Sequence, residues 1–165
     1  MDVKETVPDL QLDSLGEVFP TIIGENLNKK IMNIPGDYSD KNLIAIVAFQ
    51  RWHQGLVDES IENLECMKLH HTHFIIEVPV LQQFSRLRQM RLDGIMRAGI
   101  RDREIRQRTV TVYLDKEEFR AKLRIPNEDT IHWFVVDHAS KSIIMKGTGV
   151  VSQKDVHRID TITNH

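Results

Sequence analysis

The chain has 165 residues and a mass of 19.2 kDa, and 41% of its residues are hydrophobic, which suits one domain with one packed core. Charged residues make up 28% and the formal net charge is −2. This composition excludes a disordered polyelectrolyte and a globally basic nucleic-acid-binding protein. The single cysteine, Cys66, excludes an in-chain disulfide and a two-cysteine redox centre, and it fits a reducing compartment.

The N-terminal segment is polar and shows no sustained periodicity. We predict a flexible arm over residues 1–14 and a single domain over residues 15–165. The acidic start lacks the basic and apolar regions of a signal peptide, and no apolar stretch approaches the roughly 18 residues of a membrane span. We therefore expect a cytoplasmic protein.

The next apolar stretches predict strands. Val18–Ile23 and Leu27–Ile34 are separated by Gly24–Asn26, a turn signal that indicates a β-hairpin. Leu43–Phe49 follows as seven apolar residues in a row. A run of this kind is typical of a central strand that is buried on both faces.

A helix and a second strand complete a βαβ unit. Apolar residues from Val57 to Met67 recur at helical spacing and predict a helix that ends near His70. Phe74–Val78 is a predicted buried strand that ends at Pro79, because proline cannot donate to a strand ladder. The two strands should be parallel with a right-handed connection.

The second half of the chain continues the α/β pattern. A helical segment rich in arginine is predicted over residues 83–108, with its long helix between residues 83 and 99. Thr109–Leu114 is a predicted strand, and Lys116–Leu123 is a predicted short helix with Asp115 as N-cap.

The last third of the chain predicts a hairpin and a closing helix. Thr130–Val136 and Ser142–Lys146 are joined by a polar turn and should pair as an antiparallel hairpin. The closing helix is expected over Ser152–Ile159, with Ser152 as its cap.

This order of elements resembles the thioredoxin-like superfamily, in particular its peroxiredoxin-like branch lacking the redox cysteines. The segments that carry the resemblance are Phe19-Pro20 with Gly24 and Leu27, Leu43–Phe49, and Trp133–Asp137 followed by Ile143–Gly149. The resemblance implies an α/β class and a three-layer α/β/α fold with a mixed central sheet. An N-terminal β-hairpin and an arginine-rich helical insertion are added to it.

A weaker similarity within that branch is to an assembly factor family of mitochondrial ATP synthase. It rests on Phe119–Ile125 and on Phe134–Asp137 with the glycines that follow. This similarity implies an assembly or chaperone-type role.

The turn after the first central strand departs from the resembling enzymes, which carry their reactive cysteine there, at a helix N-terminus. Residues 50–59 contain no cysteine. An alignment with peroxiredoxins implies Val57 or Asp58 at the reactive position, and one with thioredoxins places His53 near the first cysteine. His53 is then either a packing or capping residue or a general base. The candidate ligand turn consists of Arg51, Trp52, His53 and Gln54.

A candidate metal cluster lies at the end of the predicted first helix. Its donors are Cys66, His70, His71 and His73. Cys66 and His70 are four residues apart, so on one helix they would share a face and could hold a soft divalent ion. The simpler interpretation is a small buried cysteine with histidines that line a solvated turn. We expect no metal and no other cofactor.

Arginine usage is the strongest compositional anomaly. Eight of the twelve arginines lie within residues 86–108, where three acidic residues leave a local charge of +5. Guanidinium groups suit bidentate contacts with carboxylate or phosphate, which favours an anionic partner. The alternative is a solvated helix face whose arginines pair with local acids and with the acidic remainder of the fold. The candidate partner-binding residues are Arg86, Arg88, Arg91, Arg97, Arg101 and Arg103.

Two functions follow from these observations. The first is a redox-inactive thioredoxin-like domain that acts as a protein-binding or assembly module, with no catalytic residue. The second is a thiol-dependent oxidoreductase or peroxidase that uses Cys66 or a non-standard site. The absence of cysteine from residues 50–59 favours the first. We expect the partner to be a protein with an acidic surface. Nucleic acid is unsupported because exposed aromatics do not interleave with the arginines.

Overall fold

The computed structural model describes residues 15–83 and 103–163, apart from the side chains of Arg103 and Glu104. The predicted N-terminal arm, and the predicted long helix from residue 84 onward, lie outside the described residues.

Seven strands of the described chain form one mixed sheet with the order β2-β1-β5-β4-β3-β6-β7. Their bounds are β1 Ile22–Asn26, β2 Ile31–Ile34, β3 Asn42–Ala48, β4 His73–Gln82, β5 Val110–Leu114, β6 His132–Val136 and β7 Ile143–Thr148. The apolar run predicted as a central strand is β3, which pairs in parallel with β4 and antiparallel with β6. The prediction that this strand is internal is therefore confirmed.

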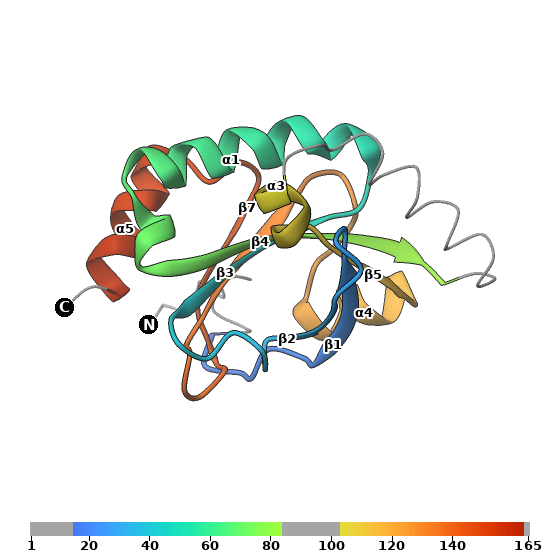
Figure 1. Ribbon diagram of the computed structural model, residues 1–165. Coiled ribbons are helices and arrows are strands. Elements are labelled where there is room, and N and C mark those ends of the chain that lie inside the picture. The colour runs from blue at the N-terminus through green and yellow to red at the C-terminus, as the bar shows by residue number, and fades with distance from the viewer. Residues whose placement is uncertain (1–14, 84–102, 164–165) are drawn as a thin grey trace, which may run out of the picture.

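Helices cover both faces of the sheet (Figure 1). The helices are α1 Gln54–Cys66, α3 Arg103–Arg108, α4 Lys116–Leu123 and α5 Gln153–Thr163, with two short 3₁₀ turns, η3 Arg51–His53 and η4 Leu69–His71. Helices α1 and α5 lie on one face, and α4 lies on the other. The connection β3–α1–β4 is the predicted βαβ unit, and the three-layer arrangement is confirmed.

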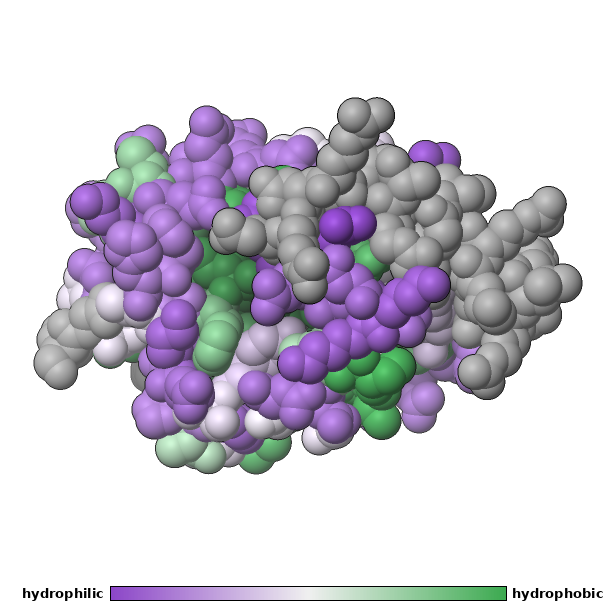
Figure 2. Space-filling model, viewed as in Figure 1, coloured by the Kyte–Doolittle hydropathy of each residue, from purple (hydrophilic) through white to green (hydrophobic). Residues whose placement is uncertain are grey.

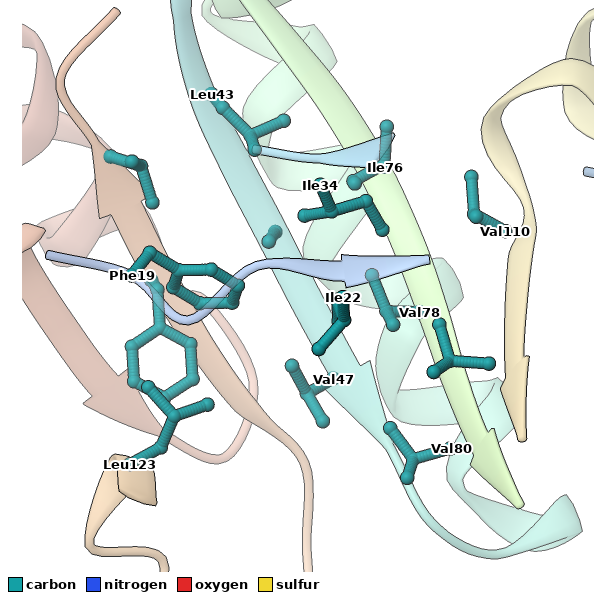
Figure 3. Close-up of a cluster of buried hydrophobic side chains, with 14 of the residues drawn as sticks. Phe19, Ile22, Ile34, Leu43, Val47, Ile76, Val78, Val80, Val110 and Leu123 are labelled. Atoms are coloured by element: carbon teal, nitrogen blue, oxygen red, sulfur yellow. The ribbon is translucent and has the colours of Figure 1, made fainter. Parts of the chain in front are cut away.

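Each face of the sheet has its own hydrophobic core. Under α1 and α5, the core includes Ile44 and Ile46 of β3 and Trp133 of β6. On the opposite face, Phe19, Ile22 of β1 and Ile34 of β2 lie over β3 and β4 (Figure 3). Leu123 of α4 packs in the same core. Neighbouring residues of β3 alternate between the two cores, which explains why this strand is apolar throughout.

The N-terminal hairpin forms, but its turn lies later than predicted. The Oδ1 atom of Asn26 accepts hydrogen bonds from the amides of Asn28 at 2.9 Å and Lys30 at 3.0 Å, so the turn follows Asn26. Gly24 is inside β1 because the adjacent strand passes close to it. A Cβ atom at Gly24 would lie 2.6 Å from the carbonyl oxygen of Thr111. The glycine therefore marks a close approach of two strands.

Two further boundaries differ from the prediction. Helix α1 ends at Cys66 rather than near His70, because Lys68 takes a left-handed conformation with a φ of 61°. Strand β4 continues through Pro79 to Gln82. Pro79 is tolerated because it pairs with the last residue of β3, and the ladder with β5 covers Val80–Gln82.

The remaining elements of the second half confirm the prediction. Asp115 caps α4 by accepting hydrogen bonds from the amides of Glu117 and Glu118. Strands β6 and β7 form the antiparallel hairpin. Ser152 Oγ accepts a hydrogen bond from the amide of Asp155 at 3.1 Å, so α5 begins where predicted and extends further, to Thr163.

Candidate binding site at the end of β3

The candidate ligand turn lies where β3 leaves the sheet. Arg51–His53 form η3, and Gln54 is the first residue of α1. Trp52 has 62% of its surface exposed, whereas the side chain of His53 next to it is fully buried. The indole and imidazole rings meet edge to face, with centroids 4.5 Å apart. The turn therefore presents one aromatic side chain to solvent and holds the next one inside.

His53 caps the end of the strand. Its Nδ1 atom accepts hydrogen bonds from the amide of Phe49 at 3.0 Å and from the amide of Gln50 at 3.3 Å. An imidazole nitrogen that accepts from two donors carries no proton, so a neutral His53 holds its proton on Nε2. Of the two roles that the sequence left open, the geometry gives His53 the capping role.

Glu128 ties the turn to α4. Its carboxylate accepts a hydrogen bond from Gln50 Nε2 at 2.9 Å and lies 2.9 Å from Lys116 Nζ and 3.7 Å from Arg120 Nε. Glu128 is not among the site residues predicted from the sequence. No local pattern indicates it, because its contact with Gln50 spans 78 residues of chain.

A second buried histidine lies close to the turn. His132 begins β6, pairs with Val47 of β3, and is 3% exposed. Burial, together with smaller effects of the neighbouring Lys146 and His53 side chains, lowers the pKa of His132 to about 4. Burial also lowers the pKa of His53, while Glu128 opposes that shift. Both imidazoles are therefore neutral at physiological pH. His132 was missed because it lies inside an apolar run.

A buried carboxylate lies beside the first residue of α1. Glu77 of β4 is 3% exposed, and Gln54 Nε2 lies 3.2 Å from its carboxylate. Arg108 Nε is 3.9 Å from the same group. Burial raises the pKa of Glu77, and Gln54 and Arg108 oppose that rise. Glu77 was also missed, because a single acidic residue within an apolar strand carries no spacing signal.

The predicted metal donors are not arranged as one site. Cys66 is exposed at the end of α1, and His70 and His71 are exposed on η4. His73 is buried, and its ring nitrogens contact Thr163 Oγ1 at 2.9 Å and the carbonyl of Leu69 at 3.3 Å. Within residues 15–83 and 103–163, no three side chains of the ligating types form a group that could hold a metal ion.

Most of the predicted partner-binding arginines, namely Arg86, Arg88, Arg91, Arg97 and Arg101, lie outside the described residues. Arg103 begins α3, and its side chain is not described. Arg108 ends the same helix, and its NH1 atom lies 3.1 Å from the carboxylate of Glu65. This arginine therefore pairs with acidic residues elsewhere in the fold, which the alternative interpretation also expects.

Comparison with known proteins identifies the fold. No family model and no curated protein matches the chain. Among solved structures, the thioredoxin domain of a thiol-disulfide oxidoreductase from Bacteroides vulgatus is 14% identical, with a TM-score of 0.55 over 91% of this chain and 98% of that one. A DsbF homologue from Corynebacterium diphtheriae is 17% identical, with a TM-score of 0.55 over 98% of each chain. The mitochondrial 2-Cys peroxiredoxin of Plasmodium falciparum is 10% identical, with a TM-score of 0.55 over 90% of this chain and 93% of that one.

The chain therefore has the thioredoxin-like fold, as the order of its elements predicted. The similarity to the assembly factor family stays a prediction, because no curated protein matches. The expected cytoplasmic location also stays a prediction. In the part of the chain that the structure describes, no helix is long and apolar enough to cross a membrane.

Proposed function

We propose that the chain is a redox-inactive binding module that contacts a protein partner through the turn of Arg51, Trp52, His53 and Gln54. The observation that supports this most directly is the exposed Trp52 at the end of β3, on a turn with no cysteine. In the resembling enzymes, the reactive thiol occupies this turn.

The turn has the composition of an interface centre. Trp52 is 62% exposed, and Arg51 beside it is also exposed. Tryptophan and arginine are enriched among the few residues that contribute most of the binding energy of interfaces. An exposed apolar residue alone carries little information, but here it lies on a rigid turn.

Three hydrogen bonds hold the turn in place. His53 holds the amides of Phe49 and Gln50 from inside, and Gln50 is hydrogen-bonded to Glu128. A pre-organised contact residue loses little conformational entropy when a partner binds, and this increases affinity. The held turn therefore favours a pre-organised contact surface, rather than a mobile loop that folds around its ligand.

The thiol-dependent alternative would rely on Cys66. This cysteine is exposed but lies at the C-terminal end of α1, whereas the turn lies at its N-terminal end. A helix of this length spans about 20 Å. A thiol at that end of α1 lacks the helix N-terminus that activates the cysteine of the resembling enzymes.

A random peptide library displayed on phage tests the binding function. We expect panning on the immobilised wild-type chain to enrich a consensus, and Trp52→Ala to abolish that enrichment. The matched control is Ile162→Ala, because Ile162 is an exposed apolar residue of α5, 48% exposed, and this variant should enrich the same consensus. If Trp52→Ala retains the consensus, the proposed contact surface is wrong.

The same selection tests the separate prediction of an acidic partner. The arginines of residues 86–103 should favour peptides rich in aspartate and glutamate, and raised salt should weaken the binding of these peptides. In the triple variant Arg88→Glu, Arg97→Glu, Arg103→Glu the acidic preference should disappear. A preference that survives in the triple variant would contradict a role for this segment.

A further inference from the structure

The hydrogen bonds of His53 are compatible with only one state of Nδ1. This atom accepts from the amides of Phe49 and Gln50, at 3.0 and 3.3 Å. If Nδ1 gained a proton, three N–H donors would point at one another with no acceptor among them. A charged His53 therefore cannot keep this cap.

The loss of the cap would act directly on Trp52. The three residues of η3 begin after Gln50 and end at His53, so Trp52 lies between the capped amides and the capping side chain. The ring of Trp52 also packs against the ring of His53. When His53 leaves its buried position, Trp52 loses both the backbone geometry and the side-chain contact that hold it.

Titratable groups from α4, β6, β7 and the loop that precedes β6 lie near His53. Lys116 of α4 disfavours the charged imidazole, and Glu128, which Lys116 and Arg120 contact, favours it. His132 of β6 approaches from the sheet, with Lys146 of β7 beyond it. Burial is the largest effect and opposes protonation. His53 therefore gains its proton only at a pH below the ordinary range for histidine. At that pH, protonation of the imidazole is favourable enough to break the cap and open the turn.

We propose that His53 is a proton-sensitive latch on the Trp52 turn: the neutral side chain holds Trp52 in its binding position, and protonation releases the turn and weakens partner binding. The binding half of this inference rests on the proposed function. The structural half, the opening of the turn on protonation, does not.

Tryptophan fluorescence tests the structural half. The emission of Trp52 is obtained as the difference between the wild-type chain and Trp52→Phe, titrated from about pH 8 to about pH 5. We expect one transition with a midpoint below the ordinary histidine pKa of 6.5, while the far-UV circular dichroism stays constant. The amides of Phe49 and Gln50 should lose their protection from hydrogen exchange over the same range.

His53→Asn is the decisive variant, because the asparagine Oδ1 atom takes the place of Nδ1 as acceptor but cannot gain a proton. We expect this variant to show no Trp52 transition. His70→Asn, a matched change of an exposed histidine, should keep the wild-type transition. If His53→Asn does not fold, the ¹⁵N shift of His53 Nδ1 in the wild-type chain replaces it, and its titration should coincide with the exposure of the two amides.

The binding half is tested with peptides selected at neutral pH on the wild-type chain. Their affinity should fall by about tenfold for each pH unit below the pKa of His53, because only the latched fraction binds. A transition that His53→Asn shares, or one that coincides with global unfolding of both proteins, would overturn the latch. If the Trp52 transition occurs as expected but no peptide binds at neutral pH, the latch stands and the proposed function fails.

Discussion

The indole ring of Trp133 on β6 fills the space above the backbone of Gly147 on β7 where a side chain of residue 147 would otherwise lie. Glycine is required here because even a methyl group would collide with the ring. We expect Gly147→Ala to lower the free energy of unfolding by about 1–3 kcal/mol, the usual cost of overpacking a core.

Urea denaturation measures this cost against a matched control. Gly55→Ala adds the same methyl group to α1, where nothing lies within 4 Å of the added Cβ. Because alanine favours helix by about 1 kcal/mol over glycine, this control should be neutral or slightly stabilising. Equal stabilities for the two variants would show that Trp133 does not occupy the position described.

The buried carboxylate of Glu77 depends on Arg108, whose guanidinium also contacts Glu65. In Arg108→Gln the carboxylate keeps its hydrogen bond from Gln54 but loses its cationic neighbour, and we expect about 1–3 kcal/mol of destabilisation at pH 7 because the buried charge is no longer balanced. The control is Arg124→Gln, whose ion pair with Glu17 is exposed and should be worth less than about 1 kcal/mol.

The effect of Arg108→Gln should also depend on pH. The pKa of Glu77 is already raised by burial, and loss of Arg108 raises it further. Protonation then removes the unpaired charge, so the stability difference between wild type and variant should shrink as the pH falls toward the ordinary range of a glutamate. A difference that stays constant from neutral to acidic pH would contradict the pairing.

His132 makes the fold sensitive to acid in a defined window. Its pKa in the folded chain is about 4, against 6.5 in the unfolded chain, so the unfolded state binds the proton first as the pH falls. The contribution of His132 to the free energy of unfolding is fully present above pH 6.5 and is lost as the pH falls toward 4. The total loss is about 3 kcal/mol.

Thermal denaturation of wild type and His132→Asn across this window measures the contribution of His132. The decrease between pH 6.5 and 4 should be smaller in the variant, whereas His71→Asn, which changes an exposed histidine of η4, should behave as wild type. Parallel curves for His132→Asn and wild type would show that the pKa of His132 is not lowered in the folded chain.

The fold was largely predictable because its central strands are continuous apolar runs. The run Leu43–Phe49 is covered on both faces, so its pattern indicated its position in the sheet as well as its type. The predicted ends of α1 and β4 were wrong, because these ends depend on the local backbone conformation and pairing. Lys68 adopts a positive φ that favours glycine, and Pro79 is accepted only because its ladder partner ends there.

The candidate site was predictable only where it is local. The turn at Arg51–Gln54 follows from the end of β3, and a capping role for His53 was one of its two expected roles. Glu128 and His132 reach the turn from residues far along the chain, and Glu77 reaches α1 from the adjacent strand. Such contacts leave no spacing pattern in one sequence, because they arise from tertiary packing.

Redox inactivity is tested by two assays, insulin reduction and peroxide consumption, with the wild-type chain and Cys66→Ser. A turn without cysteine and one thiol at the far end of α1 cannot supply an activated attacking thiolate beside the turn. We expect both proteins to show no turnover above the buffer rate. Turnover by the wild-type chain that is lost in Cys66→Ser would contradict the account and make the chain a thiol enzyme.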